Sequence, residues 1–130
     1  MNAKKLGWDN FFEDQLKTSD LSLVRARVSR QNTDHLVLLS EIGELTGILP
    51  GKFKGKEKED LPTVGDWVLA RKSEHLERSK VLIERVLARR NVLARTEIGQ
   101  EKRQQLMAAN IDRVFIVSGL DKEFNPRKIE

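Results

Sequence analysis

The sequence contains no cysteine and two histidines, His35 and His75, which stand far apart along the chain. The lack of cysteine excludes disulfides and thiolate metal sites, and two isolated histidines are too few for a zinc or iron site. No run of roughly 18 apolar residues occurs, and the two lysines near the start precede no apolar stretch. We therefore expect neither a signal peptide nor a membrane span, and a cytoplasmic location.

The chain is short enough that we look for a single hydrophobic core. It has 130 residues, of which 38% are hydrophobic. A chain of this size buries one modest core, which favours one domain with appendages over two complete domains.

Positive charge is concentrated in two regions, although the net charge is a modest +4. Residues 71–103 carry ten basic and five acidic residues, and a glycine-containing loop adds Lys52, Lys54, Lys56 and Lys58. Phosphate is the natural counter-charge for such clusters. Ordinary solvent-facing charge is the alternative interpretation, and charge alone favours neither.

The hydrophobic pattern predicts a short helix followed by a set of strands. Trp8, Phe11 and Phe12 recur at helical spacing between Gly7 and Lys17, with Asp9 as a cap. Apolar and polar residues then alternate, or form short apolar runs bounded by turns, in five segments: Leu21–Arg30, His35–Ser40, Leu45–Leu49, Val64–Ala70 and Val81–Ala88. The last segment also fits a helical face, but a strand is favoured because five short strands make a small closed antiparallel barrel.

Two further elements are expected after this barrel. Gln100–Ala109 is predicted as a short helix and Ile111–Val117 as a buried strand of the kind found inside parallel sheets. This strand resembles the start of a second domain, so we divide the chain into an N-terminal helix at 1–20, a barrel at 21–90, a connector at 91–110 and the truncated domain at 111–130. An exposed apolar strand has unpaired backbone groups, so we expect it to fold back on the barrel or to mediate weak dimers of an otherwise monomeric chain.

Three segments carry a resemblance to a known family. Pro62–Val68 reads PTVGDWV, Val86–Asn91 reads VLARRN, and Ala108–Asp121 reads AANIDRVFIVSGLD, followed by Phe124–Asn125. In order and spacing they are similar to the ribosome small-subunit-dependent GTPase A family. The resemblance covers most of the chain.

This resemblance implies a mainly β structure, an OB-fold barrel that docks on small-subunit rRNA, followed by a circularly permuted GTPase domain and a zinc-binding domain. It implies that GTP, Mg²⁺ and Zn²⁺ belong to those later domains, so no cofactor and no catalytic residue is expected within these 130 residues. Gly47–Lys52 and Gly51–Lys56 superficially suggest a phosphate-binding loop. Both have three intervening residues instead of four and lack the Ser or Thr that holds magnesium.

The expected RNA contacts are basic or polar residues in turns and loops. OB barrels bind RNA through such side chains against phosphate and an occasional planar group against a base. The candidates are Arg30, Asn32, Lys52, Lys54, Lys56, Arg89, Arg90 and Arg95. Trp67 lies inside an apolar strand and is assigned to packing. A barrel whose basic face binds an acidic protein partner is the alternative function.

Overall fold

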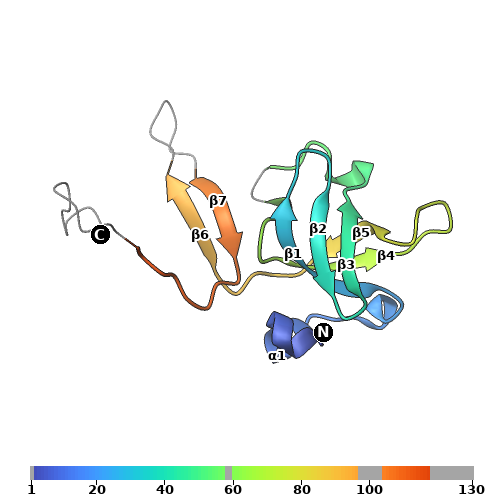
Figure 1. Cartoon of the computed structure of the whole chain (residues 1–130), viewed down its shortest axis with the longest axis horizontal. Coiled ribbons are helices and arrows are strands. Elements are labelled where there is room, and N and C mark those ends of the chain that lie inside the picture. The colour runs from blue at the N-terminus through green and yellow to red at the C-terminus, as the bar shows by residue number, and fades with distance from the viewer. Residues whose placement is uncertain (1, 58–59, 97–103, 118–130) are drawn as a thin grey trace.

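The computed structural model describes residues 2–57, 60–96 and 104–117 (Figure 1). Strands β1 to β5 close into a barrel in the order β1-β2-β3-β5-β4, and β4 pairs back with β1. Their bounds are Val24–Gln31, Leu36–Ser40, Gly43–Ile48, Trp67–Arg71 and Lys80–Val86. The pair β3 and β5 is parallel and the other pairs are antiparallel. This is an OB-type barrel, as the sequence predicted, and residues 80–86 form a strand and not a helix.

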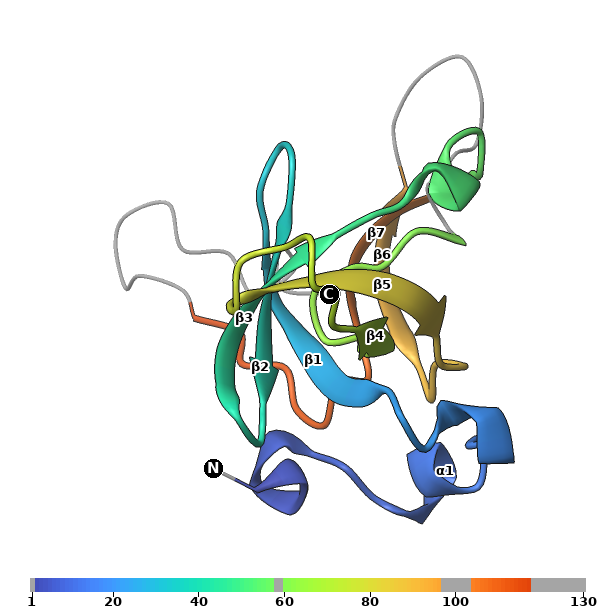
Figure 2. The ribbon, with the colours of Figure 1, turned by 90° about the vertical axis from the view of Figure 1, so that its right-hand side faces the viewer.

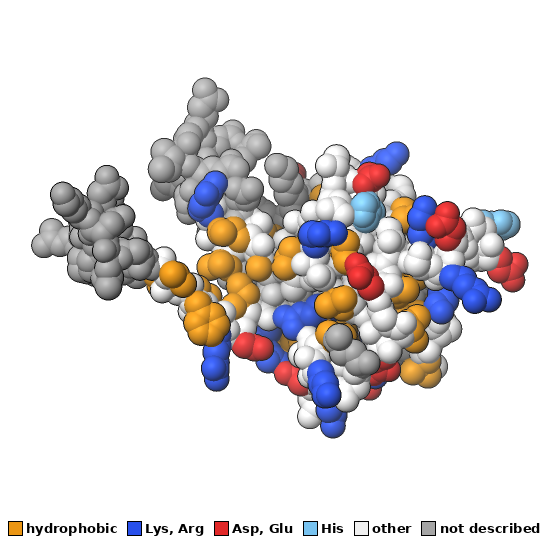
Figure 3. Space-filling model, in the orientation of Figure 1, with side chains coloured by type: hydrophobic (Ala, Val, Ile, Leu, Met, Phe, Trp, Pro, Cys, Tyr) orange, Lys and Arg blue, Asp and Glu red, His pale blue; other side chains and the backbone are white. Residues whose placement is uncertain are grey.

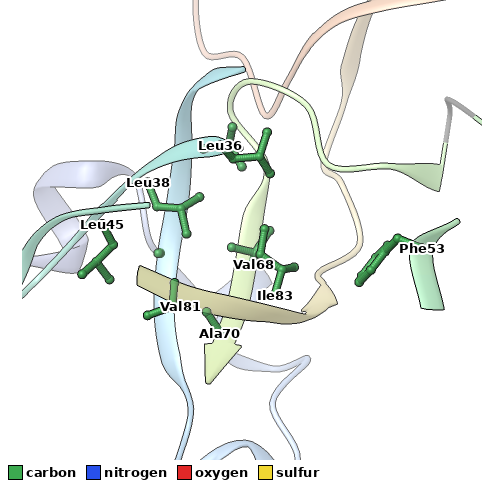
Figure 4. Close-up of a cluster of buried hydrophobic side chains, with 10 residues drawn as sticks. Leu36, Leu38, Leu45, Phe53, Val68, Ala70, Val81 and Ile83 are labelled. Carbon is green, nitrogen blue, oxygen red and sulfur yellow. The ribbon is translucent and has the colours of Figure 1, made fainter. Parts of the chain in front are cut away.

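Alternation along the strands builds the interior of the barrel. Val24, Ala26 and Val28 of β1 point inward, as their spacing predicted, and meet side chains from the other four strands. Figure 4 shows part of this cluster, which includes Leu36, Leu38, Leu45, Val68, Ala70, Val81 and Ile83. Burial of these apolar side chains is the main force that closes the barrel.

Strand β4 is buried on both faces, which explains its unbroken apolar sequence. Val68 and Ala70 face the barrel interior, whereas Trp67 and Leu69 belong to a second cluster outside it. The N-terminal segment contributes Ala3, Trp8 and Phe12 to that second cluster, and Leu87, just after β5, completes it. The ring centroids of Trp8 and Trp67 lie 4.9 Å apart in an edge-to-face arrangement. Trp67 is 1% exposed, which confirms its predicted packing role.

The N-terminal segment is less helical than its aromatic spacing predicted. It contains two 3₁₀ turns, Ala3–Leu6 and Thr18–Asp20, and one short α-helix, α1, at Asn10–Glu13. Asp9 caps α1 as expected, because its carboxylate accepts a hydrogen bond from the Phe11 amide at 3.0 Å. Within the described part of the chain, no helix is long and apolar enough to cross a membrane.

A hairpin, not a helix, follows the barrel. Strands β6 (Val92–Thr96) and β7 (Gln104–Ala109) pair antiparallel beside the barrel (Figures 1 and 2). The helix predicted at Gln100–Ala109 is therefore wrong over its described residues 104–109. Gln, Leu, Met and Ala have high helix propensity, but pairing with β6 and the contact of Ala109 with the barrel override it.

The strand predicted at Ile111–Val117 is also wrong, because these residues pair with no strand in the described chain. Val114, Phe115 and Val117 are 59%, 83% and 92% exposed, so this segment does not fold back on the barrel. Figure 3 shows hydrophobic side chains gathered on the hairpin and on the segment that follows it. A strand needs neighbours to satisfy its backbone, and none is available here.

The end of β7 is joined to the barrel by direct backbone contact. The Ala109 amide donates to the Val64 carbonyl at 2.8 Å, immediately before Gly65. Gly65 has φ +92°, and a Cβ atom added there would lie 2.0 Å from the Ala109 carbonyl oxygen. Glycine is therefore required here both for its backbone angle and for the close approach of the two segments.

Gly65→Ala should destabilise the protein more than Gly43→Ala does. Both glycines have positive φ, but nothing lies within 4 Å of a Cβ added at Gly43. Gly43→Ala should lower the free energy of unfolding by about 1 kcal/mol through backbone strain alone. Gly65→Ala should lower the free energy of unfolding clearly more, because the backbone of Ala109 must also move. Urea denaturation of both variants measures the difference. Equal losses for the two variants would show that the close approach is absent.

Candidate nucleic-acid interface

The β1–β2 turn lies at the end of the barrel opposite the N-terminal segment (Figures 1 and 2). Arg30 and Asn32 are exposed here, as predicted. The Asn32 side-chain amide lies 2.8 Å from His35 Nε2, and His35 Nδ1 lies 2.7 Å from the Asp34 carboxylate. The carboxylate–imidazole–amide chain holds the tip of the turn in one conformation while the Arg30 guanidinium is left in solvent.

The lysine-rich loop approaches the same end of the barrel. It begins with a 3₁₀ turn at Gly51–Phe53, and the buried Phe53 ring packs against the core. The ammonium groups of Lys52 and Lys56 lie 5.6 and 5.3 Å from the Phe53 ring centroid. Phe53 therefore anchors the lysines that flank it, through cation–π attraction as well as burial.

Lys52, Lys54 and Lys56 differ in how far a nearby carboxylate neutralises their charge. Lys52 Nζ donates to the backbone carbonyl of Glu84 at 2.5 Å and to its carboxylate at 3.1 Å. Hydrogen bonds from Arg71, and then from Lys52, hold the pKa of the Glu84 carboxyl below its ordinary value. Among residues 2–57, 60–96 and 104–117, no carboxylate lies within ion-pair distance of Lys54 or Lys56. These two exposed lysines present the more available charge.

Arg89 is held inside the protein. Its guanidinium donates to both carboxylate oxygens of Asp66, at 2.9 and 2.8 Å, and to the Leu61 carbonyl at 2.9 Å. The Arg89 side chain is 18% exposed and Asp66 is fully buried. Hydrogen bonding to Asp66 raises the pKa of Arg89 above its ordinary value. A guanidinium in such a bidentate ion pair stabilises the fold, so Arg89 is not part of the proposed RNA-binding surface.

Arg90 fastens the N-terminal segment, and Arg95 lies elsewhere. The Arg90 guanidinium forms an ion pair with Asp9 and stands 5.2 and 5.6 Å from the ring centroids of Phe11 and Phe12. The hydrogen bond from Arg90 is the main cause of a lowered Asp9 pKa. Arg95 is exposed on β6, on the hairpin and away from the β1–β2 turn. The structure thus brings Arg30, Asn32 and the three lysines to one end of the barrel and separates them from the arginines after β5.

Arg27 and Asn110, which the sequence did not single out, connect three parts of the chain. The Arg27 guanidinium donates to three backbone carbonyls, those of Leu6 at 2.5 Å, Gly65 at 3.0 Å and Asn110 at 2.7 Å. Burial lowers the pKa of Arg27, although Asp112 and Asp66 oppose this effect. The alternation of apolar and polar residues along β1 places Arg27 on the outer face of the strand. This pattern does not show that the backbone of other segments covers that face.

Asn110 has every polar group engaged. It adopts a left-handed backbone with φ 54°, a conformation that asparagine tolerates better than most residues. Its amide donates to the Asn91 carbonyl at 2.9 Å, and its side chain bonds the Gly65 carbonyl and the Arg90 amide at 3.0 and 2.8 Å. We call Arg27, Gly65, Asn91 and Asn110 the junction. Its residues outside β1 come from the PTVGDWV, VLARRN and AANID segments, so the three segments behind the family resemblance meet at one place.

No family model matches the sequence, but curated proteins match it along its whole length. The small ribosomal subunit biogenesis GTPase RsgA of Opitutus terrae is 36% identical over 100% of the chain, and that of Syntrophotalea carbinolica is 35% identical over 100%. The chain is a relative of the RsgA proteins. It spans 38% and 37% of the length of these two RsgA proteins, and 33% of the RsgA protein of Mesorhizobium japonicum, which is 36% identical.

Two solved structures are also similar to this chain. YjeQ from Thermotoga maritima gives a TM-score of 0.49 at 26% identity, over 70% of this chain and 28% of that one. The circularly permuted GTPase YloQ gives a TM-score of 0.45 at 15% identity, over 60% and 27%. The assignment of an OB-type barrel rests on the strand order and pairing described above, and the relation to RsgA rests on the sequence matches.

Removal of Arg89 should destabilise the protein. Arg89→Met leaves the fully buried Asp66 carboxylate without its guanidinium, which should lower the free energy of unfolding by about 3 kcal/mol. Arg95→Met is the matched control, because that side chain is exposed, and it should change stability by less than about 0.5 kcal/mol. Urea denaturation of both variants measures the difference. A neutral Arg89→Met would contradict a supporting role for the pair.

Proposed function

We propose that this chain is the rRNA-binding part of a GTPase that acts in late maturation of the small ribosomal subunit. The RsgA relatives are named for small-subunit biogenesis and for GTPase activity. An OB-type barrel is a common support for RNA recognition through its loops. The observation that carries the proposal is a pair of exposed lysines, Lys54 and Lys56, which have no carboxylate partner within the described part of the chain and lie beside the exposed tip of the β1–β2 turn.

Phosphate is the partner that fits this end of the barrel. Each exposed lysine that meets a phosphate releases a condensed counterion, which makes binding favourable and strongly dependent on salt. Arg30 can reach a phosphate with a planar pair of donors, while Asn32 offers a donor and an acceptor that suit the edge of a base. Lys52 contributes less, because Glu84 already neutralises part of its charge. Arg90 is likewise committed to Asp9, and Arg95 would serve only RNA that reaches the hairpin.

GTP chemistry, in this proposal, belongs to parts of the protein outside these 130 residues. The sequence has no phosphate-binding loop of the required spacing, and its two lysine-containing glycine segments lack the Ser or Thr that would hold Mg²⁺. GTP, Mg²⁺ and Zn²⁺ are accordingly assigned to the remaining length of an RsgA-type protein, of which this chain spans 38%. The chain itself would dock that protein on the small subunit and would not hydrolyse GTP.

We further propose that residues 111–130 begin the GTPase domain. The apolar segment Val114–Val117 is exposed here, yet its composition is typical of a strand buried inside a sheet. The hairpin adds apolar surface through the exposed side chains of Val92, Leu93 and Met107. A following domain that covers both would remove a large exposed apolar patch.

Loss of Lys54 and Lys56, which have no ion-pair partner among the residues that the structure describes, should reduce the salt dependence of rRNA binding. For Lys54→Ala/Lys56→Ala, the slope of log K against log salt should fall by about 1.4 to 1.8, because two phosphate contacts are lost. Fluorescence anisotropy with a labelled small-subunit rRNA fragment at several salt concentrations measures this slope.

The matched control is Lys72→Ala/Arg78→Ala, which removes the same charge from the exposed β4–β5 connection. It should leave the slope nearly unchanged. Equal slopes for the two double variants would contradict the placement of the RNA site. Salt-independent binding, or none, would favour the alternative of an acidic protein partner.

A further inference from the structure

A groove opens between the β1–β2 turn and the segment that follows β3. It has a volume of about 280 Å³, and its lining residues come from 32–36, from 49, 50, 53 and 54, and from Leu61. Its apolar walls come from Leu36, Leu49, Pro50, Phe53 and Leu61. Its polar rim comes from Asn32, Thr33, Asp34, His35 and Lys54. The predicted RNA contacts Asn32 and Lys54 therefore both line one largely apolar groove.

The hydrogen bonds on the rim determine which group Asn32 presents to the groove. The Asp34 carboxylate accepts from His35 Nδ1, so in the neutral imidazole Nε2 is an acceptor and takes a hydrogen bond from the Asn32 amide nitrogen. Asn32 Oδ1 then remains as an acceptor, with no partner among the described residues. A ligand with an N–H donor on its edge would complete this chain.

We propose that the groove holds one unstacked nucleobase of a single-stranded RNA segment. The proposal rests on the proposed function and names the part of the RNA that this end of the barrel recognises. The flat apolar faces of the base would lie against apolar side chains of the groove such as Leu49 and Leu61, and its N–H edge would donate to Asn32 Oδ1. The Lys54 ammonium would contact the adjoining phosphate.

Three properties of the groove fit a nucleotide. Its volume accommodates one base and part of a sugar, and proteins that read single-stranded RNA splay bases out and hold them against apolar or aromatic side chains. Its charge is complementary to phosphate, because Lys54 in its lining and Lys56 beside Phe53 have no carboxylate partner in the described chain, while the Asp34 carboxylate keeps its charge but is 87% exposed and therefore screened by solvent. Its polar groups lie at the rim and its apolar groups inside, which matches a base attached to a charged backbone.

The test compares two ligands by NMR of the backbone amides and methyl groups of the full 130-residue chain. One is a single-stranded RNA of about ten nucleotides, within the range that OB folds bind, and the other is a base-free sugar–phosphate oligomer of equal length. Both should perturb residues around Lys54 and Lys56. The RNA alone should shift the methyl groups of Leu36, Leu49 and Leu61, because the base-free oligomer has nothing to place in the groove.

Two variants test the groove by binding affinity, independently of the NMR chemical shifts. Asn32→Ala should weaken RNA binding by about threefold to tenfold, since one hydrogen bond to the base is lost. It should leave binding of the base-free oligomer unchanged. Asn10→Ala, at the far end of the barrel, should affect neither ligand.

The outcomes separate this inference from the proposed function. If small-subunit rRNA binds with the expected salt dependence but the short RNA fails to bind, or shifts the same methyl groups as the base-free oligomer does, the groove proposal is overturned and rRNA docking survives. If rRNA itself fails to bind, both fall. RNA-specific shifts together with the Asn32→Ala effect support the groove.

Discussion

The arrangement of this protein depends on the hydrogen bonds that the Arg27 guanidinium donates. It joins backbone carbonyls from the N-terminal segment, from the turn before β4 and from the end of the hairpin. These carbonyls have no strand partner at those places, and a buried carbonyl without a donor is costly. A single planar cation with five donors satisfies all three, and burial without a direct carboxylate partner lowers its pKa.

The same constraint separates the structural arginines from the surface that we propose for RNA binding. Arg27, Arg89 and Arg90 hold the N-terminal segment, the turn before β4 and the junction together, so their charge is directed inward or already paired. At the opposite end of the barrel, Arg30, Lys54 and Lys56 are exposed. A barrel fixed at one end and open at the other therefore presents its free charge in one direction, which suits docking on a polyanion.

The sequence predicted a structural element correctly where the local pattern alone determines it. It failed where contacts with residues distant in the sequence determine the conformation. The alternation of Val24, Ala26 and Val28 correctly predicted a half-buried strand, because that pattern records one face directly. The helix at 100–109 was wrong because pairing with β6 decides the conformation there, and the strand at 111–117 was wrong because a strand without neighbours does not form. Arg27 and Arg89 look like surface charges in sequence, and only the fold shows the carbonyls and the Asp66 carboxylate around them.

Co-sedimentation of the chain with purified ribosomal subunits tests the central claim most directly. The account predicts that the chain travels with the small subunit and not with the large one, and that Lys54→Glu/Lys56→Glu abolishes this while its unfolding curve stays unchanged. Equal association with both subunits, or full association of the charge-reversed variant with the small subunit, would contradict it.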